Sequence, residues 1–518
     1  MIDLDDLIPA TSPQDKFGTH PSGVAWAPAQ IAIFEAIVRR VDNVLINAVA
    51  GSGKTTTIEA GVRFTSPNER IVFLAFNKAI ADELSRRVPR HVLAKTFHAL
   101  GFAALRSSGW RGEVDGRKLR NILQEVLPDN AKGSAADLDY GAECIKLISH
   151  AKSRAMFLED PASQSAMVEI AQGIEIDEGT YRLPQICNWA AQAFRISANM
   201  RDTIDFDDML WLPFYLKCNW PQFDRTFVDE VQDLNYIQHL IVQRVSAGQV
   251  IAVGDRAQSI YAFRGATPSS MDDMKLMFSM VEFPLSVTYR CARSIVDLAR
   301  EWVPHLTPRD GAPEGQVIIE PEVPVDLDYF FQNGAIHEPL IICRQNKPLI
   351  KLGLRMLGEQ RRFTIRSNLE GSLTYFVDTL TKKKDQMPIA DFRAILDKWF
   401  EEIEKSCHDS GRMGQLAASQ DRYDALVALG EDTMVVDVRS LKRLIAQLFA
   451  GRDGPLLCTI HKSKGLEADE VVILRPELIP SRFAKTEVDL IQEYNLLYVA
   501  RTRAKRILTL MYDSSEDI

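Results

Sequence analysis

The sequence predicts an α/β protein with two parallel sheets, each carrying a mostly helical insertion. Two observations predict this fold class. Short apolar runs occur in two separate sets along the chain, and a long segment with helical periodicity interrupts each set. A third observation, a glycine-rich loop directly after the first run, points to the chemistry of the first sheet.

The apolar runs are brief, rich in β-branched or aromatic residues, and followed by polar or helical sequence. Buried strands of a parallel sheet have this pattern. We therefore expect one sheet from each set of runs. The first set is 43–48, 70–76, 225–230 and 249–255, and the second set is 339–344, 455–460, 470–474 and 506–512.

Two longer segments are mostly helical in period and lack comparable strand runs. They cover about 106–200 and 350–450, and amphipathic spacing is clear in 391–405 and 438–449. We read them as insertions into the two sheet domains. The expected divisions are 1–105 and 201–284 for the first lobe, 106–200 for its insertion, 285–349 and 451–518 for the second lobe, and 350–450 for its insertion.

Composition narrows the class of protein. The 518 residues are 46% hydrophobic and 25% charged, which favours packed domains over disorder. The net charge of −9 means that a nucleic-acid partner would need a local basic groove. The seven cysteines form no CxxC pair, which argues against a zinc site or a disulfide framework. Because we find no apolar signal core and no run of membrane-spanning length, we expect no membrane partner and a cytoplasmic protein, or a nuclear one in a eukaryote.

The glycine-rich loop, AVAGSGKT at 48–55, lies between the first strand and a helix. Gly51 and Gly53 allow backbone N–H groups to close around phosphates, and the helix N-terminus adds a favourable field. Lys54 would neutralise the β- and γ-phosphates, and Thr55 would ligate Mg²⁺. The loop departs from the usual pattern at its first position, which is Ala48. A plain glycine-rich turn is the alternative, but the strand–loop–helix context favours phosphate binding.

An acidic pair closes another expected strand. Asp229 is placed to hold Mg²⁺, and Glu230 is placed to orient or deprotonate an attacking water. Adjacent acidic residues more often form a solvated face. Here an apolar strand leads into the pair and a phosphate loop precedes it, so together the two motifs indicate nucleotide hydrolysis.

Further motifs follow in a fixed order and resemble those of superfamily 1 helicases of the UvrD/Rep type. Within these motifs, the sequences LAFNK, FRGA and YNLLYVA are most similar to those of the F-box-helicase branch and its viral and bacterial relatives. The resemblance implies two RecA-like P-loop lobes with ATP bound at their interface. The motifs are FLAFNKAIADEL (73–84), KTFHAL (95–100), DEVQD (229–233), VGDRAQSIYAFRGA (253–266), LSVTYR (285–290), TIHKSKGLE (459–467) and YNLLYVARTRA (494–504).

The resemblance implies a role for each residue that would contact ATP. Gln30 reads the adenine, Tyr289 stacks on it, and Gln258 senses the γ-phosphate. Arg290 and Arg503 stabilise γ-phosphate charge from the second lobe; ordinary surface ion pairs are the alternative. Thr55 and Asp229 hold Mg²⁺, and Lys54 and Glu230 complete the catalytic set. The other implied nucleotide contacts are Gly51, Ser52, Gly53, Lys54, Thr55, Thr56 and Glu467.

The resemblance also implies contacts with a nucleic-acid strand. Phe263 matches an aromatic residue on which a base stacks, although a core aromatic is an equal alternative on spacing alone. Arg264, Thr96, His98 and His461 lie in motifs that touch the strand. Every base has a π face, so stacking suits a motor that must tolerate any sequence.

Two segments match family motifs less fully. Phe76 is a candidate second stacking platform, in a motif one residue shorter than usual. Residues 204–208, IDFDD, also resemble a family motif, but helix capping is the simpler account of their acidic side chains.

The expected function is that of an ATP-dependent 3′→5′ DNA helicase or translocase. Its expected partners are ATP, Mg²⁺, single-stranded DNA and single-strand/duplex junctions, and we expect a monomer. The insertion at 350–450 is shorter than in large bacterial members, and the chain stops at Ile518, where relatives place a strand-separating hairpin. A translocase that strips proteins from DNA is therefore one alternative. An ATP-gated binding module is another, against which Glu230, Gln258, Arg290 and Arg503 argue.

Overall fold

The chain divides into two compact units, described separately below. Unit 1 comprises residues 1–119, 149–160 and 195–288, and unit 2 comprises 120–148, 161–194 and 289–518. The computed structural model describes residues 17–20, 23, 25–131, 140–157, 163–174, 176, 181–260, 269–320, 327–330, 338–367, 369–410, 413–451 and 453–512.

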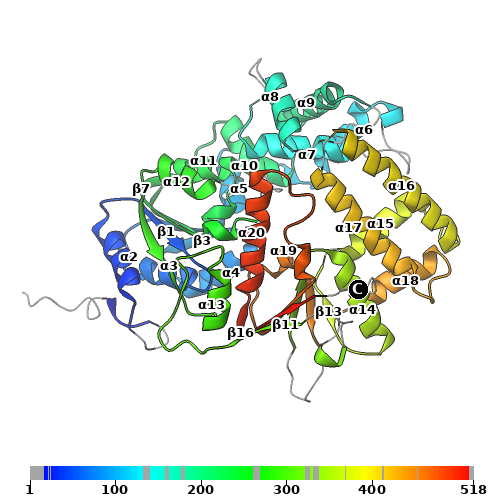
Figure 1. The fold of residues 1–518 in the computed structure, drawn as a ribbon. Coiled ribbons are helices and arrows are strands. Elements are labelled where there is room, and N and C mark those ends of the chain that lie inside the picture. The colour runs from blue at the N-terminus through cyan, green and yellow to red at the C-terminus, as the bar shows by residue number, and fades with distance from the viewer. Residues whose placement is uncertain are drawn as a thin grey trace, which may run out of the picture. The chain divides into compact units, whose positions relative to one another are not determined.

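Unit 1 is built on a six-stranded sheet in which every neighbouring pair is parallel. Strands β1 and β7 are labelled beside helices α2 and α3 in Figure 1. The order is β3-β2-β6-β7-β1-β8, with bounds Val92–Thr96, Ile71–Ala75, Phe223–Val228, Ser246–Gly254, Val44–Ala48 and Val281–Leu285. The four strands expected from the first set of apolar runs are confirmed, and the two edge strands β3 and β8 add to them.

Helices pack against this sheet and begin at polar caps. Asn77, Thr96 and Asn235 each accept a backbone N–H with the side chain at the start of a helix. In the core, the rings of Phe73 and Phe227 on adjacent strands stack at 5.9 Å between centroids. The helices are α2 (Pro28–Arg39), α3 (Lys54–Arg63), α4 (Lys78–Arg87), α5 (Phe97–Ser107), α10 (Phe206–Tyr215), α11 (Tyr236–Val245) and α12 (Ser270–Met277).

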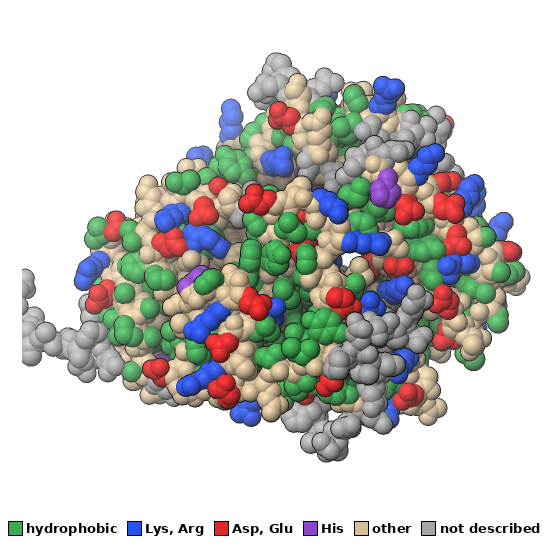
Figure 2. All heavy atoms as spheres, in the orientation of Figure 1, with side chains coloured by type: hydrophobic (Ala, Val, Ile, Leu, Met, Phe, Trp, Pro, Cys, Tyr) green, Lys and Arg blue, Asp and Glu red, His purple; other side chains and the backbone are tan. Residues whose placement is uncertain are grey.

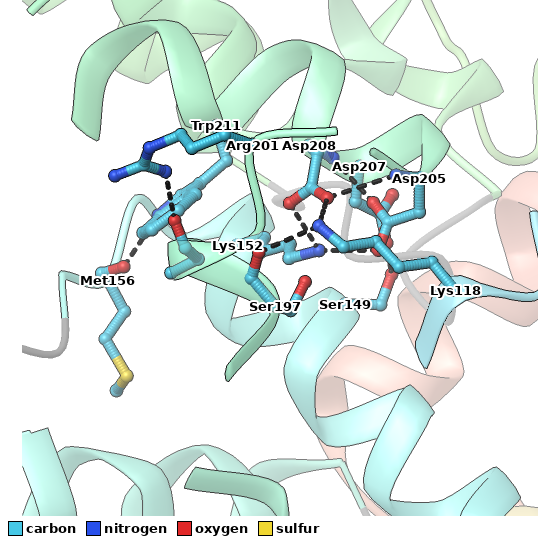
Figure 3. Close-up of polar contacts among 11 residues, drawn as sticks. Lys118, Ser149, Lys152, Met156, Ser197, Arg201, Asp205, Asp207, Asp208 and Trp211 are labelled. Atoms are coloured by element: carbon cyan, nitrogen blue, oxygen red, sulfur yellow. Dashed lines mark hydrogen bonds and ion pairs between the residues drawn. The ribbon is translucent and has the colours of Figure 1, made fainter. Parts of the chain in front are cut away.

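The capping expected within 204–208 is confirmed at the start of α10. The Asp205 carboxylate accepts the N–H of Asp208 at 2.7 Å, and the Asp208 carboxylate accepts the N–H of Asp205 at 3.1 Å. Both carboxylates also bind buried lysines (Figure 3). Lys118 lies 2.7 Å from Asp208, and Lys152 lies 2.7 Å from Asp205 and 2.8 Å from Asp208. We call these four side chains the buried charge cluster.

Unit 2 contains a second six-stranded sheet, again parallel at every pairing. Its order is β11-β16-β15-β12-β14-β13. The four expected strands of the second set are confirmed, and β11 and β13 are additional. The bounds, in sheet order, are Gln316–Glu320, Ala504–Met511, Ala468–Leu474, Leu340–Cys343, Leu456–Thr459 and Thr364–Ile365.

The helices expected over 391–405 and 438–449 are present in unit 2. The second begins with a capping box in which Asp437 and Ser440 bond reciprocally. The helices are α13 (Arg293–Ala299), α14 (Asn346–Gly358), α15 (Leu369–Thr381), α16 (Ile389–Ser410), α17 (Met413–Gly430), α18 (Val438–Phe449), α19 (Ile460–Ser463) and α20 (Glu487–Arg501).

Within the described part of 106–200, the regular elements are helices apart from one short strand. That strand, β4 (Glu113–Val114), pairs in parallel with β5 (Thr203–Ile204). The helices are α6 (Lys118–Val126), α7 (Tyr140–Ser153), α8 (Ser163–Gly173) and α9 (Leu183–Asn199).

No helix in the described ranges has the length and apolar character needed to span a membrane. Acidic and basic side chains are interspersed over the face drawn in Figure 2.

Candidate functional site

The candidate site lies at the carboxyl edge of the unit 1 sheet. Parallel strands end at the same edge, so residues that follow different strands meet there. Strand β1 leads into the glycine-rich loop, β6 leads into Asp229, and β7 leads into Asp255. Because β6, β7 and β1 are neighbours, the loop and both carboxylates lie side by side.

The loop has the geometry of a phosphate cradle. Gly51 and Gly53 have φ values of 71° and 79°, in the left-handed region that glycine adopts without strain. Helix α3 begins at Lys54, so its first N–H groups face the loop. The Ser52 hydroxyl and the Lys54 ammonium nitrogen are buried and make no hydrogen bond to any described group. Buried polar groups normally have partners, so this site fits an anionic ligand such as phosphate.

The pair of expected Mg²⁺ ligands is assembled. Thr55 Oγ1 lies 3.4 Å from Asp229 Oδ2. Burial, reinforced by the neighbouring Glu230 charge, raises the pKa of Asp229 to about 7. Lys54 opposes this shift only in part, and a divalent cation would supply further positive charge. The residues present therefore fit Mg²⁺, whose preferred ligands are oxygens.

Glu230 occupies an unusual backbone conformation directly after β6. Its φ is 52°, a left-handed value that is uncommon for a residue other than glycine. Its N–H donates to Asp229 Oδ1 at 2.8 Å, and its carboxylate accepts a bond from Gln232 Nε2. A short 3₁₀ helix, η3 (Val231–Asp233), follows at once. The turn therefore holds Glu230 directly beside the expected Mg²⁺ ligand Asp229, and its catalytic role stays a prediction.

Asp255 and Gln232 belong to this network although sequence analysis did not single them out. Gln258 Nε2 donates to Asp255 Oδ2 at 2.7 Å, and the Asp255 N–H donates to Gln232 Oε1 at 3.0 Å. Lys54 Nζ lies 3.9 Å from Asp255. Burial raises the pKa of Asp255, and Lys54 opposes that shift. The end of the 249–255 run was the available signal, because a polar residue there faces the same edge as the phosphate loop.

Gln30 also lies beside the phosphate loop. Its Nε2 donates to Thr57 Oγ1 at 2.9 Å, and its Oε1 accepts the Ala27 N–H at 3.1 Å. The buried amide is therefore held in one orientation. Thr56, on the first turn of α3, is half-buried. The structure thus brings together all the expected nucleotide contacts of unit 1.

Unit 2 assembles its own set of expected residues. Arg290 Nε donates to Glu467 at 2.7 Å, and Arg290 Nη1 donates to the Thr502 carbonyl at 3.1 Å. Burial would raise the pKa of Glu467, but Arg290 and Lys505 hold it below its usual value. Arg503, which follows Thr502 in the chain, is 2% exposed and donates to the backbone carbonyls of residues 499 and 466. Tyr289 is 48% exposed, so its ring is accessible for stacking.

The structure shows where three of the expected nucleic-acid residues lie, and their contacts with DNA stay predictions. Thr96 and His98 lie at the end of β3 and the start of α5, and Phe76 directly follows the adjacent β2. Thr96 caps α5, with its hydroxyl accepting the Ala99 N–H at 3.2 Å. Burial lowers the pKa of His98, which favours a neutral ring. His461 lies on α19 of unit 2 and is half-buried.

The positions of two other expected nucleic-acid residues are not described. Phe263 and Arg264 fall within 261–268, outside the described residues. Their roles remain predictions.

The fold and the site together define a P-loop nucleotide-binding protein. Comparison with protein families then identifies its kind. The family model described as the UvrD/REP helicase N-terminal domain matches residues 30–279, and that of the UvrD-like helicase C-terminal domain matches 419–515. The chain belongs to the UvrD-like helicases.

Curated relatives are similar at low identity over nearly the whole chain. F-box DNA helicase protein 1 of Schizosaccharomyces pombe is 24% identical over 96% of this chain and 58% of its own length. F-box DNA helicase 1 of Gallus gallus is 24% identical over 98% and 51%, and the probable DNA helicase II homolog of Mycoplasma pneumoniae is 22% identical over 92% and 82%. The chain thus spans little more than half the length of the two F-box relatives.

A solved arterivirus helicase, nonstructural protein 10, covers 93% of this chain and 62% of its own, at 12% identity and a TM-score of 0.34. A similarity this weak does not establish a shared fold. The two parallel sheets and the family matches define the fold of this chain.

Proposed function

We propose that this chain is an ATP-driven motor that moves 3′→5′ along single-stranded DNA and opens duplex ahead of it. The observation that carries the proposal is the carboxyl edge of the unit 1 sheet. There the phosphate loop, the Thr55–Asp229 pair and the Glu230 turn meet. Thr96 ends strand β3 of the same sheet, and His98 lies in the first turn of the helix α5 that follows it. Family membership supplies the class of substrate.

In the proposed hydrolysis, each residue acts on one part of the triphosphate. Lys54 neutralises the β- and γ-phosphates, and Thr55 with Asp229 holds Mg²⁺, which would neutralise phosphate charge. Glu230 accepts the proton of the attacking water. The 2.8 Å bond from its N–H to Asp229 holds the Glu230 backbone against that residue, and Gln232 binds its carboxylate.

Two groups respond to charge on the γ-phosphate. Gln258, held by Asp255, senses it in unit 1. Arg290 and Arg503 are the proposed cationic partners, and their side chains are already fixed by Glu467 and by backbone carbonyls. Fixed cations stabilise a transition state more effectively than mobile ones, because they need no reorganisation.

The first experiment measures steady-state ATP turnover with and without a single-stranded oligonucleotide. Wild-type turnover should rise on adding DNA. Lys54→Ala should abolish turnover, and Glu230→Gln should bind Mg²⁺–ATP without hydrolysing it. A Glu230→Gln protein with wild-type turnover would show that the general base is assigned wrongly. ATP turnover that is the same with and without DNA would favour an ATP-gated binding module.

The second experiment tests the track. Phe263→Ala should weaken single-strand binding by about 1–3 kcal/mol, the usual worth of one stacked base, while leaving basal turnover largely intact. The exposed tyrosine Tyr375, on α15 of unit 2, provides a matched control as Tyr375→Ala. Equal DNA affinity in both variants would remove Phe263 from the track.

The third experiment tests direction and output on partial duplexes with a 3′ or a 5′ single-stranded tail. Displacement should be faster from the 3′ tail. Faster displacement from the 5′ tail would reject the polarity. DNA-stimulated turnover with no displacement from either substrate, but with release of a protein bound ahead, would favour a stripping translocase.

A further inference from the structure

A buried polar chain lies behind the hydrolysis turn in unit 1, outside every motif role assigned above. His239 Nε2 lies 2.8 Å from Ser270 Oγ, and Ser270 Oγ donates to the Val231 carbonyl at 2.5 Å. His239, Ser270 and Val231 are each 0% exposed. The three residues belong to α11, α12 and η3, so side chains from two helices converge on the backbone next to Glu230.

The direction of these bonds follows from proton counting. A serine hydroxyl has one proton, and Ser270 uses it on the Val231 carbonyl. His239 must therefore donate its Nε2–H to the Ser270 oxygen. Nδ1 is then a bare acceptor, and it makes no hydrogen bond among the described groups. Burial lowers the pKa of His239 to about 4, so the neutral ring that this arrangement needs is the form present near pH 7.

The Val231 carbonyl is a controlling point of the turn. It already accepts the Leu234 N–H at 3.2 Å, and the Glu230 carbonyl accepts the Asp233 N–H at 3.0 Å. The Ser270 hydroxyl fills the second lone pair of the Val231 carbonyl. The Glu230 and Val231 carbonyls thus close successive turns of η3, so a bond that fixes the Val231 carbonyl also supports the backbone that follows the left-handed Glu230.

Packing at the start of α12 leaves little freedom for this contact to shift. A Cβ added at Gly254 would lie 2.5 Å from Gln232 Oε1 and 2.9 Å from Met271 Sδ. Met271, the residue after Ser270, and the Gln232 amide that binds Glu230 therefore both pack close to β7 at Gly254. A helix start locked in this way can hold a neighbouring turn in a strained conformation.

We propose that Ser270 and His239 are positioning residues that hold the Glu230 turn in its hydrolytic conformation, Ser270 directly and His239 by orienting the Ser270 hydroxyl. The inference rests on the proposed function, since it assigns Glu230 to hydrolysis. Its structural half does not depend on catalysis, because it specifies which side chains fix the backbone of residues 230–234.

The test compares Ser270→Ala with Ser269→Ala, a matched control whose exposed hydroxyl binds Asp273 at 2.9 Å. A second pair is His239→Leu, which removes the donor, and His239→Gln, which retains one. Hydrogen exchange of peptides covering 228–235 should be faster in Ser270→Ala and His239→Leu than in wild type. Ser269→Ala should exchange like wild type, and His239→Gln should restore protection at least in part.

Turnover provides the functional measurement. In Ser270→Ala, kcat should fall about 5- to 20-fold, the usual worth of one buried hydrogen bond, with KM for ATP within about twofold of wild type. Exchange and kcat that match Ser269→Ala would overturn the inference. A wild type without turnover would instead reject the proposed function, and the exchange data would still decide whether Ser270 and His239 hold the turn.

Discussion

Gln258 and Lys54 approach the same carboxylate oxygen. Asp255 Oδ2 accepts the Gln258 amide at 2.7 Å and lies 3.9 Å from Lys54 Nζ. One buried acidic group thus contacts both the proposed γ-phosphate sensor and the lysine of the phosphate loop. In the nucleotide-free protein it provides the counter-charge for Lys54, a part that the phosphates of a bound nucleotide would take over.

Asp255→Asn should destabilise the nucleotide-free protein and spare the nucleotide-bound one. Without the negative charge, Lys54 is left buried and uncompensated, and the free energy of unfolding should fall by about 1–3 kcal/mol. Thermal unfolding with and without a non-hydrolysable ATP analogue measures this. Asp272→Asn, which breaks an ion pair between Arg256 and a half-exposed aspartate on α12, is the control and should have little effect. Equal destabilisation with and without the analogue would contradict the assignment.

Arg290→Ala and Arg503→Ala should each impair hydrolysis far more than nucleotide binding. Cations that act on transition-state charge change kcat rather than ground-state affinity. Turnover and nucleotide affinity are measured for each variant. Arg501→Ala is the control, since Arg501 forms an ion pair with exposed Glu301 and has no proposed role at the phosphate. Lost affinity with preserved turnover in the first two variants would refute the assignment.

Lys152→Met should strongly destabilise unit 1. It removes the ion pairs of Lys152 with both buried carboxylates and leaves the pair of Lys118 with Asp208. Breaking a buried ion pair costs about 3–5 kcal/mol. Lys398→Met removes an exposed i,i+4 pair with Glu402 and should cost less than about 1 kcal/mol. Unfolding midpoints compare the two. A similar small shift in both would mean that the buried cluster tolerates an unpaired charge.

Acid should destabilise the protein partly through His239. Its pKa falls from 6.5 to about 4 on folding because of burial, and Asp273 only partly opposes this. Between these values the unfolded state binds a proton that the folded state does not, so this contribution is present above pH 6.5 and is lost as pH falls toward 4. The loss by pH 4.5 should be about 2–3 kcal/mol.

His239→Gln has no imidazole at this position to bind the proton. Its unfolding midpoint should therefore rise relative to that of wild type as pH falls. His305→Gln, at an exposed position, should follow wild type at each pH. A difference between His239→Gln and wild type that stays constant from pH 7 to 4.5 would contradict this account.

The central strands could be predicted from sequence and the edge strands could not. The residues of β2 are buried throughout, so Ile71–Ala75 forms a continuous apolar run. By contrast, β3 (Val92–Thr96) alternates buried and exposed positions, and β8 contains Pro284. An edge strand is covered on fewer sides, so its sequence carries less apolar signal.

The site divides along a similar line. The meeting of Lys54, Asp229 and Glu230 at one sheet edge could be predicted, because each lies in a short motif that follows a strand. Ser270 and His239 could not, because a buried serine and histidine on separate helices have no local pattern that distinguishes them from ordinary core residues. Only the fold brings them to Val231.

The buried charge cluster has a practical consequence for biochemistry on this protein. Mobile ions cannot enter the space between side chains that are 0–1% exposed, such as Lys118, Lys152 and Asp208, so electrolyte screens their attraction weakly. Binding of basic surface groups to DNA phosphates, in contrast, falls steeply with added salt. A high-salt wash should therefore remove copurified nucleic acid from the protein while leaving the start of α10 intact, which allows a true DNA-free baseline for every turnover measurement.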